Sequence, residues 1–169
     1  MAILSEGRLQ FIFGSSCLAE KYDEWSFYRN QFQSTCLGVK AVDMICVSNN
    51  TSWLIEIKDY RQHKRTKPQD LGGEVAVKVR DTLAGLVAAK MNANDSSEQN
   101  FAKKAIQSKV IKVVLHLEQP EKYSKLFPRA IDPAAVKQSL KRQLRAIDAH
   151  PSIVNKNSLS SNMDWKVTG

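Results

Sequence analysis

The stretch from Ala41 to Tyr60, AVDMICVSNNTSWLIEIKDY, restricts the fold more than any other part of the sequence. Two apolar runs containing Val, Ile and Trp flank a polar centre, and these residue types favour β-strands. The centre holds Asn49-Asn50, and Asn tolerates the positive φ angles that tight hairpin turns require. The stretch therefore predicts an antiparallel β-hairpin that turns at these two asparagines.

The position of the turn determines which side chains share a face of the hairpin. With Asn49-Asn50 as a two-residue turn, counting outward along both strands brings Asp43 opposite Glu56. Opposed residues of an antiparallel pair project to the same side, with Cβ atoms about 5 Å apart. Because side chains alternate along a strand, Lys58 also lies on that side. We therefore expect two carboxylates and an ammonium together at one end of the hairpin, provided that the register does not slip by one residue.

This group of charges is typical of a phosphodiester-cleaving site. Two opposed carboxylates repel each other unless a cation lies between them, and Mg²⁺ is bound through one or two carboxylates together with waters and phosphate oxygens. A neighbouring lysine can activate a water or stabilise charge on a phosphate. The pattern therefore predicts metal-dependent hydrolysis. The alternative is a surface hairpin with an ordinary cross-strand charge cluster.

Asp43, a gap of twelve residues, and then Glu56-Ile57-Lys58 resemble the PD-(D/E)xK nuclease superfamily. The usual Pro before the Asp is Val42 here, and the resemblance extends over roughly residues 20–118. It implies an α/β protein with a restriction-endonuclease-like αβββαβ core, in which helices flank a mixed central sheet. The chain is expected to form a single domain over residues 1–169, with the core at about 17–118 and an extension at about 119–169 that adds a C-terminal helix.

The resemblance also implies roles for individual residues. Asp43, Glu56 and Lys58 are expected to be catalytic, with the lysine orienting the attacking water. The implied cofactor is Mg²⁺ or Mn²⁺, and an acid of the first helix often joins such a site. For any one of these acids, a capping or solvated carboxylate is the alternative. The expected metal ligands are Asp43, Glu56, the backbone carbonyl of Ile57, and either Glu20 or Asp23, with Glu24 ranked behind them.

The balance of charge favours a nucleic acid as partner. The chain has 25 Lys and Arg against 17 Asp and Glu, for a net charge of +8. Such an excess favours a polyanionic partner through phosphate neutralisation. The alternative is a basic protein whose charge only keeps it dispersed. A basic stretch at residues 61–69 follows the hairpin and predicts a phosphate-contacting loop rather than a solvated connector. The expected nucleic-acid contacts are Arg61, Lys64, Arg65, Lys67 and the helical Lys78.

Hydrophobic periodicity predicts the other elements of the fold. Residues 8–14 and 110–117 are expected to form strands, and short edge strands are expected after Ser152. Residues 17–22 fit either a strand or the start of a helix. A first helix is expected after Asp23, with Trp25, Tyr28 and Phe32 facing the core. Residues 92–100 read as a polar loop, and residues 101–108 fit a short helix.

Two longer helices are predicted in the second half of the chain. The first spans about 74–91, and the second begins at Asp132-Pro133 and extends to about Asp148. The second helix carries a basic flank, for which a solvated face is the usual alternative to nucleic-acid contact. The apolar residues that we expect to pack the first of these helices on the sheet are Val75, Val79, Leu83, Leu86, Val87 and Met91.

Cysteine use and hydropathy exclude several classes of protein. Three scattered cysteines without CxxC or Cys/His spacing predict free thiols and argue against structural zinc. The sequence contains no apolar run of about 18 residues, so no membrane span is expected. The first 14 residues lack the pattern of a secretory signal. These features predict a cytoplasmic protein in a reducing compartment.

The sequence and the resemblance together predict a metal-dependent nuclease that hydrolyses phosphodiester bonds of nucleic acid. DNA is the expected substrate, because the superfamily mostly acts on DNA, and many such nucleases form homodimers to cut both strands. The alternative is a non-catalytic nucleic-acid-binding protein on the same fold. A protein-interaction module, such as a partner that neutralises a basic nuclease toxin, is expected to be acidic, and this chain is basic.

Overall fold

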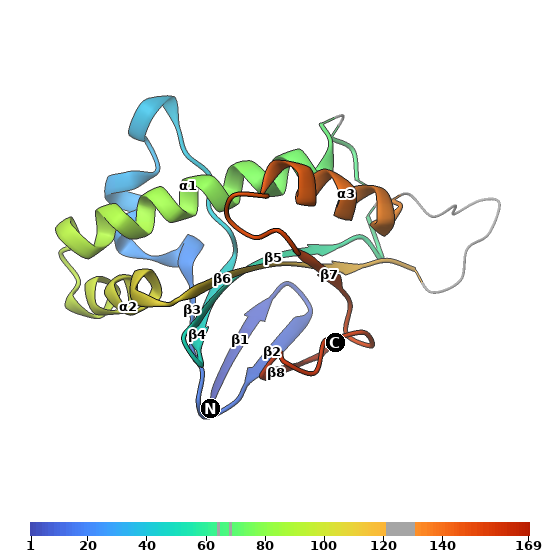
Figure 1. Ribbon diagram of the computed structural model, residues 1–169, viewed down its shortest axis with the longest axis horizontal. Helices are drawn as coiled ribbons and strands as arrows, with labels where there is room; N and C mark the ends of the chain where they lie inside the picture. Colours follow the sequence, from blue (N-terminus) through green and yellow to red (C-terminus); the bar gives the residue numbers. More distant parts are fainter. Residues whose placement is uncertain (64, 68, 121–130) are drawn as a thin grey trace.

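The structure is a computed structural model that describes residues 1–63, 65–67, 69–120 and 131–169. In this part of the chain, a five-stranded mixed sheet lies between a layer of helices and a three-stranded antiparallel sheet (Figure 1). The α/β class that the sequence predicts, with helices beside a mixed sheet, is therefore confirmed. The strands are β1 (Ala2–Glu6), β2 (Leu9–Phe13), β3 (Leu18–Lys21), β4 (Met44–Ser48), β5 (Thr51–Asp59), β6 (Val110–Glu118), β7 (Ser152–Val154) and β8 (Trp165–Thr168).

The central sheet has the order β3-β4-β5-β6-β7. The first three strands are antiparallel to one another, and β6 and β7 continue the sheet in parallel with β5. The β4–β5 hairpin turns at Asn49 and Asn50, whose φ angles of 48° and 57° are both left-handed. The predicted register is confirmed, because Ser48 pairs with Thr51 and Ile45 pairs with Leu54.

Each face of the central sheet covers a separate hydrophobic core. On one face, Leu54 and Leu115 pack against the helices. On the other face, Ile55 and Ile57 pack against the sheet that β1, β2 and β8 form. The predicted strand at 8–14 is β2, and residues 17–22 resolve as the strand β3. The alternation of side chains along β5 thus sends Glu56 to the helical face, because its two neighbours point the opposite way.

In the described residues, three α-helices cover the central sheet on that face: α1 (Leu71–Asn92), α2 (Ser96–Gln107) and α3 (Pro133–Gln143). Each begins after an aspartate whose side chain accepts hydrogen bonds from backbone N–H groups of the first turn. Asp132 and Pro133 start α3 as predicted, but the helix ends five residues before Asp148. The predicted polar loop at 92–100 is shorter than expected, because Asp95 caps α2.

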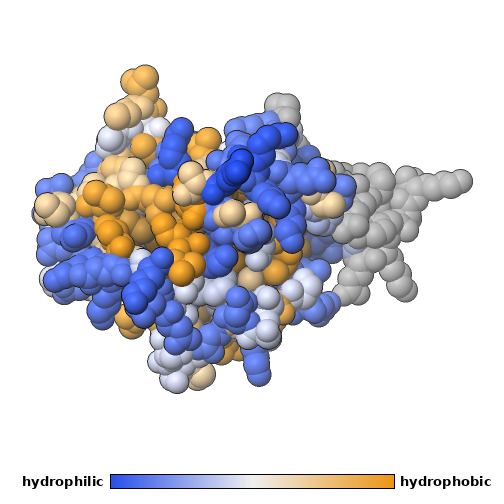
Figure 2. All heavy atoms as spheres, viewed as in Figure 1, coloured by the Kyte–Doolittle hydropathy of each residue, from blue (hydrophilic) through white to orange (hydrophobic). Residues whose placement is uncertain are grey.

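The predicted apolar stripe of α1 is only partly correct. Val75, Val79 and Leu86 are buried, whereas Val87 and Met91 are 57% and 68% exposed. The C-terminal half of α1 extends beyond the sheet, and Figure 2 shows a hydrophobic patch over this half of the helix. Periodicity identifies one apolar face but not how much of it meets a partner layer.

The predicted first helix is the main error at the level of secondary structure. Residues 22–37 form short turns instead: a 3₁₀ turn at Tyr22–Glu24, a π-type turn at Tyr28–Phe32 and a 3₁₀ turn at Thr35–Leu37. Trp25 and Tyr28 are nevertheless buried, as their spacing predicts. The described chain therefore has a strand, β3, and not a long helix ahead of the β4–β5 hairpin, so the specific αβββαβ core is not established.

None of the helices in the described residues combines the length and the apolar character that crossing a membrane requires.

Candidate functional site

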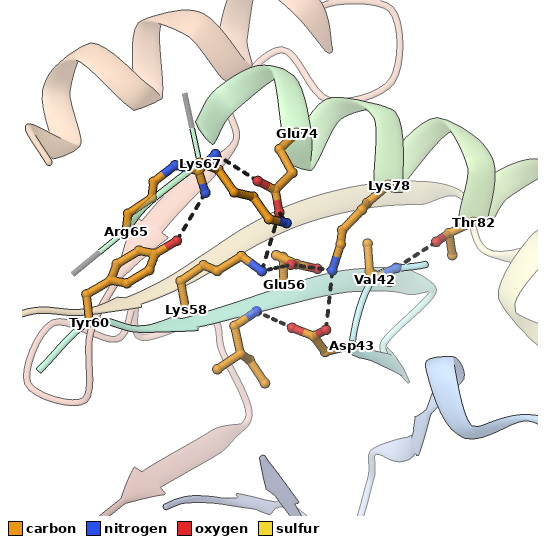
Figure 3. Close-up of polar contacts among 11 residues, drawn as sticks. Val42, Asp43, Glu56, Lys58, Tyr60, Arg65, Lys67, Glu74, Lys78 and Thr82 are labelled. Atoms are coloured by element: carbon orange, nitrogen blue, oxygen red, sulfur yellow. Dashed lines mark hydrogen bonds and ion pairs between the residues drawn. The ribbon is translucent and has the colours of Figure 1, made fainter. Parts of the chain in front are cut away.

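The charged end of the β4–β5 hairpin lies beneath the N-terminal half of α1. The segment that leads into β4 is tied to this helix, because the backbone N–H of Val42 donates to Thr82 Oγ1 at 3.0 Å. Asp43 follows directly, and its Oδ2 accepts from the backbone N–H of Ile57 at 2.6 Å. This bond continues the hairpin pairing and brings the Asp43 carboxylate beside Glu56. The two carboxylates and Lys58 thus gather on one face, as the register predicts (Figure 3).

Lys78 of α1 occupies the space between the two carboxylates. Its Nζ lies 2.5 Å from Glu56 Oε1 and 3.5 Å from Asp43 Oδ1. Lys58 Nζ approaches the same oxygen of Glu56 at 2.7 Å. Figure 3 shows the two lysines converging on Glu56 from the helix and from the strand. The charge repulsion that the sequence led us to assign to a metal is therefore offset by two ammonium groups of the chain itself.

Burial dominates the electrostatics of this cluster, which comprises Asp43, Glu56, Lys58 and Lys78. Glu56 is fully buried, and desolvation together with the nearby Asp43 charge raises its pKa to about 7. Burial also raises the pKa of Asp43, against the opposing effect of Lys78. Burial acts to lower the pKa of Lys58, but Glu56 and Asp43 outweigh it and raise that pKa above its ordinary value. Lys58 therefore stays charged while Glu56 titrates near neutrality.

The carboxylate oxygens of the cluster are better placed to bind the lysines of the chain than to bind a divalent cation. A Mg²⁺ ion between Asp43 and Glu56 has to displace Lys78, which already contacts one oxygen of each carboxylate. Among the described residues, no three His, Cys, Asp or Glu side chains gather as a metal site. One feature favours a further cation: Glu56 Oε2 is buried without a hydrogen-bond partner in the described chain. The metal site at Asp43, Glu56 and the Ile57 carbonyl stays a prediction.

The two acids proposed to complete that site lie in different places. Asp23 lines the same surface hollow as Asp43 and Lys78, and this hollow has a volume of about 530 Å³. Burial and the Asp43 charge raise the pKa of Asp23 to about 6. Glu20 lies in β3 and lines a separate hollow with Glu98. Of the two, only Asp23 borders the cluster.

The predicted phosphate-contacting residues of the loop after β5 differ in how they are engaged. Arg61 forms a salt bridge with Asp59 at 2.7 Å and donates to the C-terminal Gly169 oxygen at 2.8 Å. Arg65 and Lys67 both pair with Glu74 of α1, at 2.8 and 3.2 Å. Lys64 lies outside the described residues. The loop is therefore anchored to α1 through a carboxylate that the sequence did not single out.

Glu74 has a strongly perturbed environment. Burial acts to raise its pKa, but hydrogen bonds from Arg65 and Lys67 outweigh burial and lower the pKa to about 2. Glu74 lies four residues before Lys78, so both side chains emerge on one face of α1. That spacing is the only sequence signal that connects Glu74 to the site, because its partners come from a separate loop.

The outward face of α3 presents a second group of cations, which we call the α3 face. Its four members are exposed, and none forms a salt bridge with a carboxylate of the described chain. Figure 1 places α3 beside the N-terminal half of α1, and in Figure 2 the surface there is largely hydrophilic. The α3 face consists of Lys137, Lys141, Arg142 and the adjoining Arg145.

Comparisons with known proteins point away from a nuclease. The chain is 36% identical over 165 residues to a cysteine–tRNA ligase from Neisseria meningitidis serogroup A, strain Z2491. The match covers 79% of this chain but 24% of the ligase, so the chain spans about a quarter of the length of this relative. No family model matches the sequence, and no solved structure matches it.

This similarity corrects the function that the sequence predicted. Assignment to the PD-(D/E)xK superfamily, and with it a Mg²⁺-dependent nuclease, is contradicted by a relative that is a tRNA ligase. The expected catalytic roles of Asp43, Glu56 and Lys58 rested on that resemblance. The error has a physical reason. An Asp and a Glu-x-Lys on a hairpin can also form a buried group of ion pairs without a metal, because Lys78 of the helix neutralises the carboxylates. The geometry was correctly predicted, but the nuclease activity inferred from it is contradicted.

Proposed function

We propose that this chain binds RNA, with transfer RNA as its ligand, as a domain related to a region of an aminoacyl-tRNA synthetase. The α3 face is the observation that carries the proposal, because it offers four exposed cations without carboxylate partners in the described chain. Cations of this kind release counterions from a phosphate backbone when they bind it. The relative is named for its action on tRNA, and this name is the reason for choosing RNA over DNA.

The arrangement of charge within the chain supports RNA binding at one localised surface rather than a diffuse attraction to the whole protein. Lys58 and Lys78 are 19% and 16% exposed and pair with carboxylates, so little of their charge reaches solvent. In contrast, Lys137 and Lys141 lie one helical turn apart on α3 and are exposed. Spacing of about 6 Å along the helix, from four residues at a rise of 1.5 Å, lets both side chains contact the same strand of RNA.

Salt-dependent binding of tRNA tests the proposal. We expect the affinity of the full chain, measured by fluorescence anisotropy with labelled tRNA, to fall steeply as salt rises. Replacing all four cations of the α3 face by Gln is expected to reduce the slope of log K against log salt by about 3. Tighter binding of tRNA than of duplex DNA of similar length is the second expected result.

A matched variant controls for net charge. Lys103, Lys104, Lys109 and Lys166 are exposed elsewhere, and replacing these four by Gln changes the net charge by the same amount. We expect this variant to keep most of the tRNA affinity. Equal losses in both variants would show that the attraction is diffuse, and absence of any salt-dependent tRNA binding would overturn the proposed function.

A further inference from the structure

Three cations converge on the carboxylate of Glu74. Arg65 Nη2 lies 2.8 Å from Oε2, while Lys67 Nζ and Lys58 Nζ lie 3.2 and 3.7 Å from Oε1. The cations come from β5 and from the loop that follows it, and the carboxylate comes from α1 (Figure 3). One guanidinium and two ammoniums around a compact anion form the kind of donor set that binds phosphate in proteins.

Two of the three cations, Arg65 and Lys58, have supports that do not depend on Glu74. Arg65 Nη2 also donates to the Gln69 carbonyl at 2.7 Å, and Arg65 Nη1 donates to Tyr60 Oη at 3.2 Å. Lys58 keeps its contact with Glu56 at 2.7 Å. These two cations are therefore expected to stay in place when another anion replaces the Glu74 carboxylate.

The set is reachable from solvent. Lys58, Arg65, Lys67 and Glu74 line a surface hollow of about 240 Å³ together with Tyr60, whose ring supplies an aromatic surface beside the cations. The side chain of Lys67 is 65% exposed, whereas that of Glu74 is 10% exposed. An incoming anion thus meets Lys67 at the edge of the hollow before it meets Arg65 and the carboxylate, whose side chains are each 10% exposed.

We propose that Lys58, Arg65 and Lys67 form a phosphate-binding site for RNA, in which the Glu74 carboxylate holds the place of the phosphate until RNA displaces it. This inference rests on the proposed function and deepens it, because it names the group of the RNA that is bound. The low pKa of Glu74 keeps it ionised at neutral pH. A competing anion is therefore required to open the site. An internal phosphodiester carries one negative charge, and a terminal phosphate carries about two.

Glu74→Gln is the direct test, because it removes the competing charge and keeps the shape. Asp95→Asn is the matched control: it changes the net charge equally, and Asn caps a helix as well as Asp does. Asp95 lies near the opposite end of α1, roughly 30 Å away at a rise of 1.5 Å per residue. We expect Glu74→Gln to bind tRNA about tenfold more tightly than the wild type, a factor that corresponds to 1.4 kcal/mol. Asp95→Asn is expected to change affinity less than twofold.

Lys67→Ala keeps the test decisive if Glu74→Gln folds poorly. Lys67 is mostly exposed, so its loss leaves the fold intact. The variant is expected to weaken tRNA binding and, combined with Glu74→Gln, to cancel most of the gain. Equal affinity changes for Glu74→Gln and Asp95→Asn, or a Lys67→Ala variant that binds like the wild type, would overturn the phosphate site.

Two further arms separate this inference from the proposed function. Inorganic phosphate should raise the melting temperature of Glu74→Gln more than that of the wild type. If it does and tRNA does not bind, the phosphate site stands and the RNA-binding proposal fails. If tRNA binds and neither phosphate nor Glu74→Gln has an effect, the RNA-binding proposal stands and the phosphate site fails. Oligonucleotides with a 5′-phosphate or a 5′-hydroxyl show which phosphate of the RNA is bound. If the site binds a terminal phosphate, the two oligonucleotides differ in affinity, and if it binds an internal phosphodiester, they bind equally.

Discussion

The charged cluster beneath α1 holds two cations and the α3 face holds four, and the two groups lie in opposite environments. In the cluster, Lys58 and Lys78 are mostly buried and contact Glu56 at 2.7 and 2.5 Å. On the α3 face, Lys137 and Lys141 are exposed and have no carboxylate partner in the described chain. The difference shows that the number of cations in a sequence does not identify a nucleic-acid surface. Their exposure and their partners do.

The two regions should also differ in what they contribute to the fold. A buried ion pair that loses one partner leaves an uncompensated charge in a low-dielectric site, which is strongly destabilising. An exposed cation loses little on substitution because water already solvates it. Lys78, which contacts only carboxylates of the cluster, is therefore expected to act on stability, and the lysines of the α3 face on binding.

Lys78→Ala should give the largest effect on stability. It leaves Glu56 with Lys58 alone and leaves Asp43 without its nearest cation, so we expect a loss of about 4 kcal/mol in the free energy of unfolding at pH 7.5. Lys141→Ala on α3 is the control and should change this free energy by less than 0.5 kcal/mol. Denaturant unfolding measures both variants, and similar values for the two would remove the distinction between the regions.

The pH dependence of the free energy of unfolding should reveal the titration of Glu56. Burial and Asp43 raise its pKa from 4.5 in the unfolded chain to about 7 in the folded protein. The folded state therefore binds more protons between these values, and the free energy of unfolding falls as pH rises from about 4.5 to 7. We expect Glu56 to account for about 3 kcal/mol of this fall.

Glu56→Gln separates this contribution from those of other acids. Comparing denaturant unfolding at pH 5 and pH 8, we expect a smaller difference for Glu56→Gln than for the wild type. A remaining slope of the same sign is expected from Asp23, whose pKa is about 6. An unchanged difference would mean that Glu56 is ionised throughout the range.

The hairpin shows how much of the fold the sequence determines locally. Asn49 and Asn50 allow a left-handed turn, and alternation along the strands then places Asp43, Glu56 and Lys58 on one face. Each of these steps depends only on residues adjacent in sequence or paired across the turn. This part of the prediction needed no knowledge of the rest of the chain, and the structure confirms it.

The features that could not be predicted depend on contacts between distant segments. Arg65 meets Glu74 only because the loop that follows β5 folds back on α1. The predicted first helix failed for a similar reason: Glu98 of α2 accepts hydrogen bonds from the backbone N–H groups of Ser26 and Phe27. These bonds replace helical ones and favour short turns.

Single substitutions on the α3 face should sharpen the comparison through binding. Lys141→Gln is expected to weaken tRNA binding about fivefold and to lower the salt slope by about 1, because one phosphate contact is lost. Lys78→Met should leave the salt slope unchanged, because its ammonium is enclosed by carboxylates. A larger change in slope for Lys78→Met would indicate that RNA reaches into the cluster.

Magnesium gives the smallest expected effect and tests the sequence-based metal prediction directly. Lys78 holds the space between Asp43 and Glu56, so the wild type should gain little stability from Mg²⁺. Lys78→Met vacates that space beside the unpartnered Glu56 Oε2 and should be stabilised by about 0.4 kcal/mol when the Mg²⁺ concentration equals its Kd. Thermal unfolding with Mg²⁺, and with an equal ionic strength of Na⁺ as control, measures this gain. Stronger stabilisation of the wild type than of Lys78→Met would show that the ion and Lys78 do not compete.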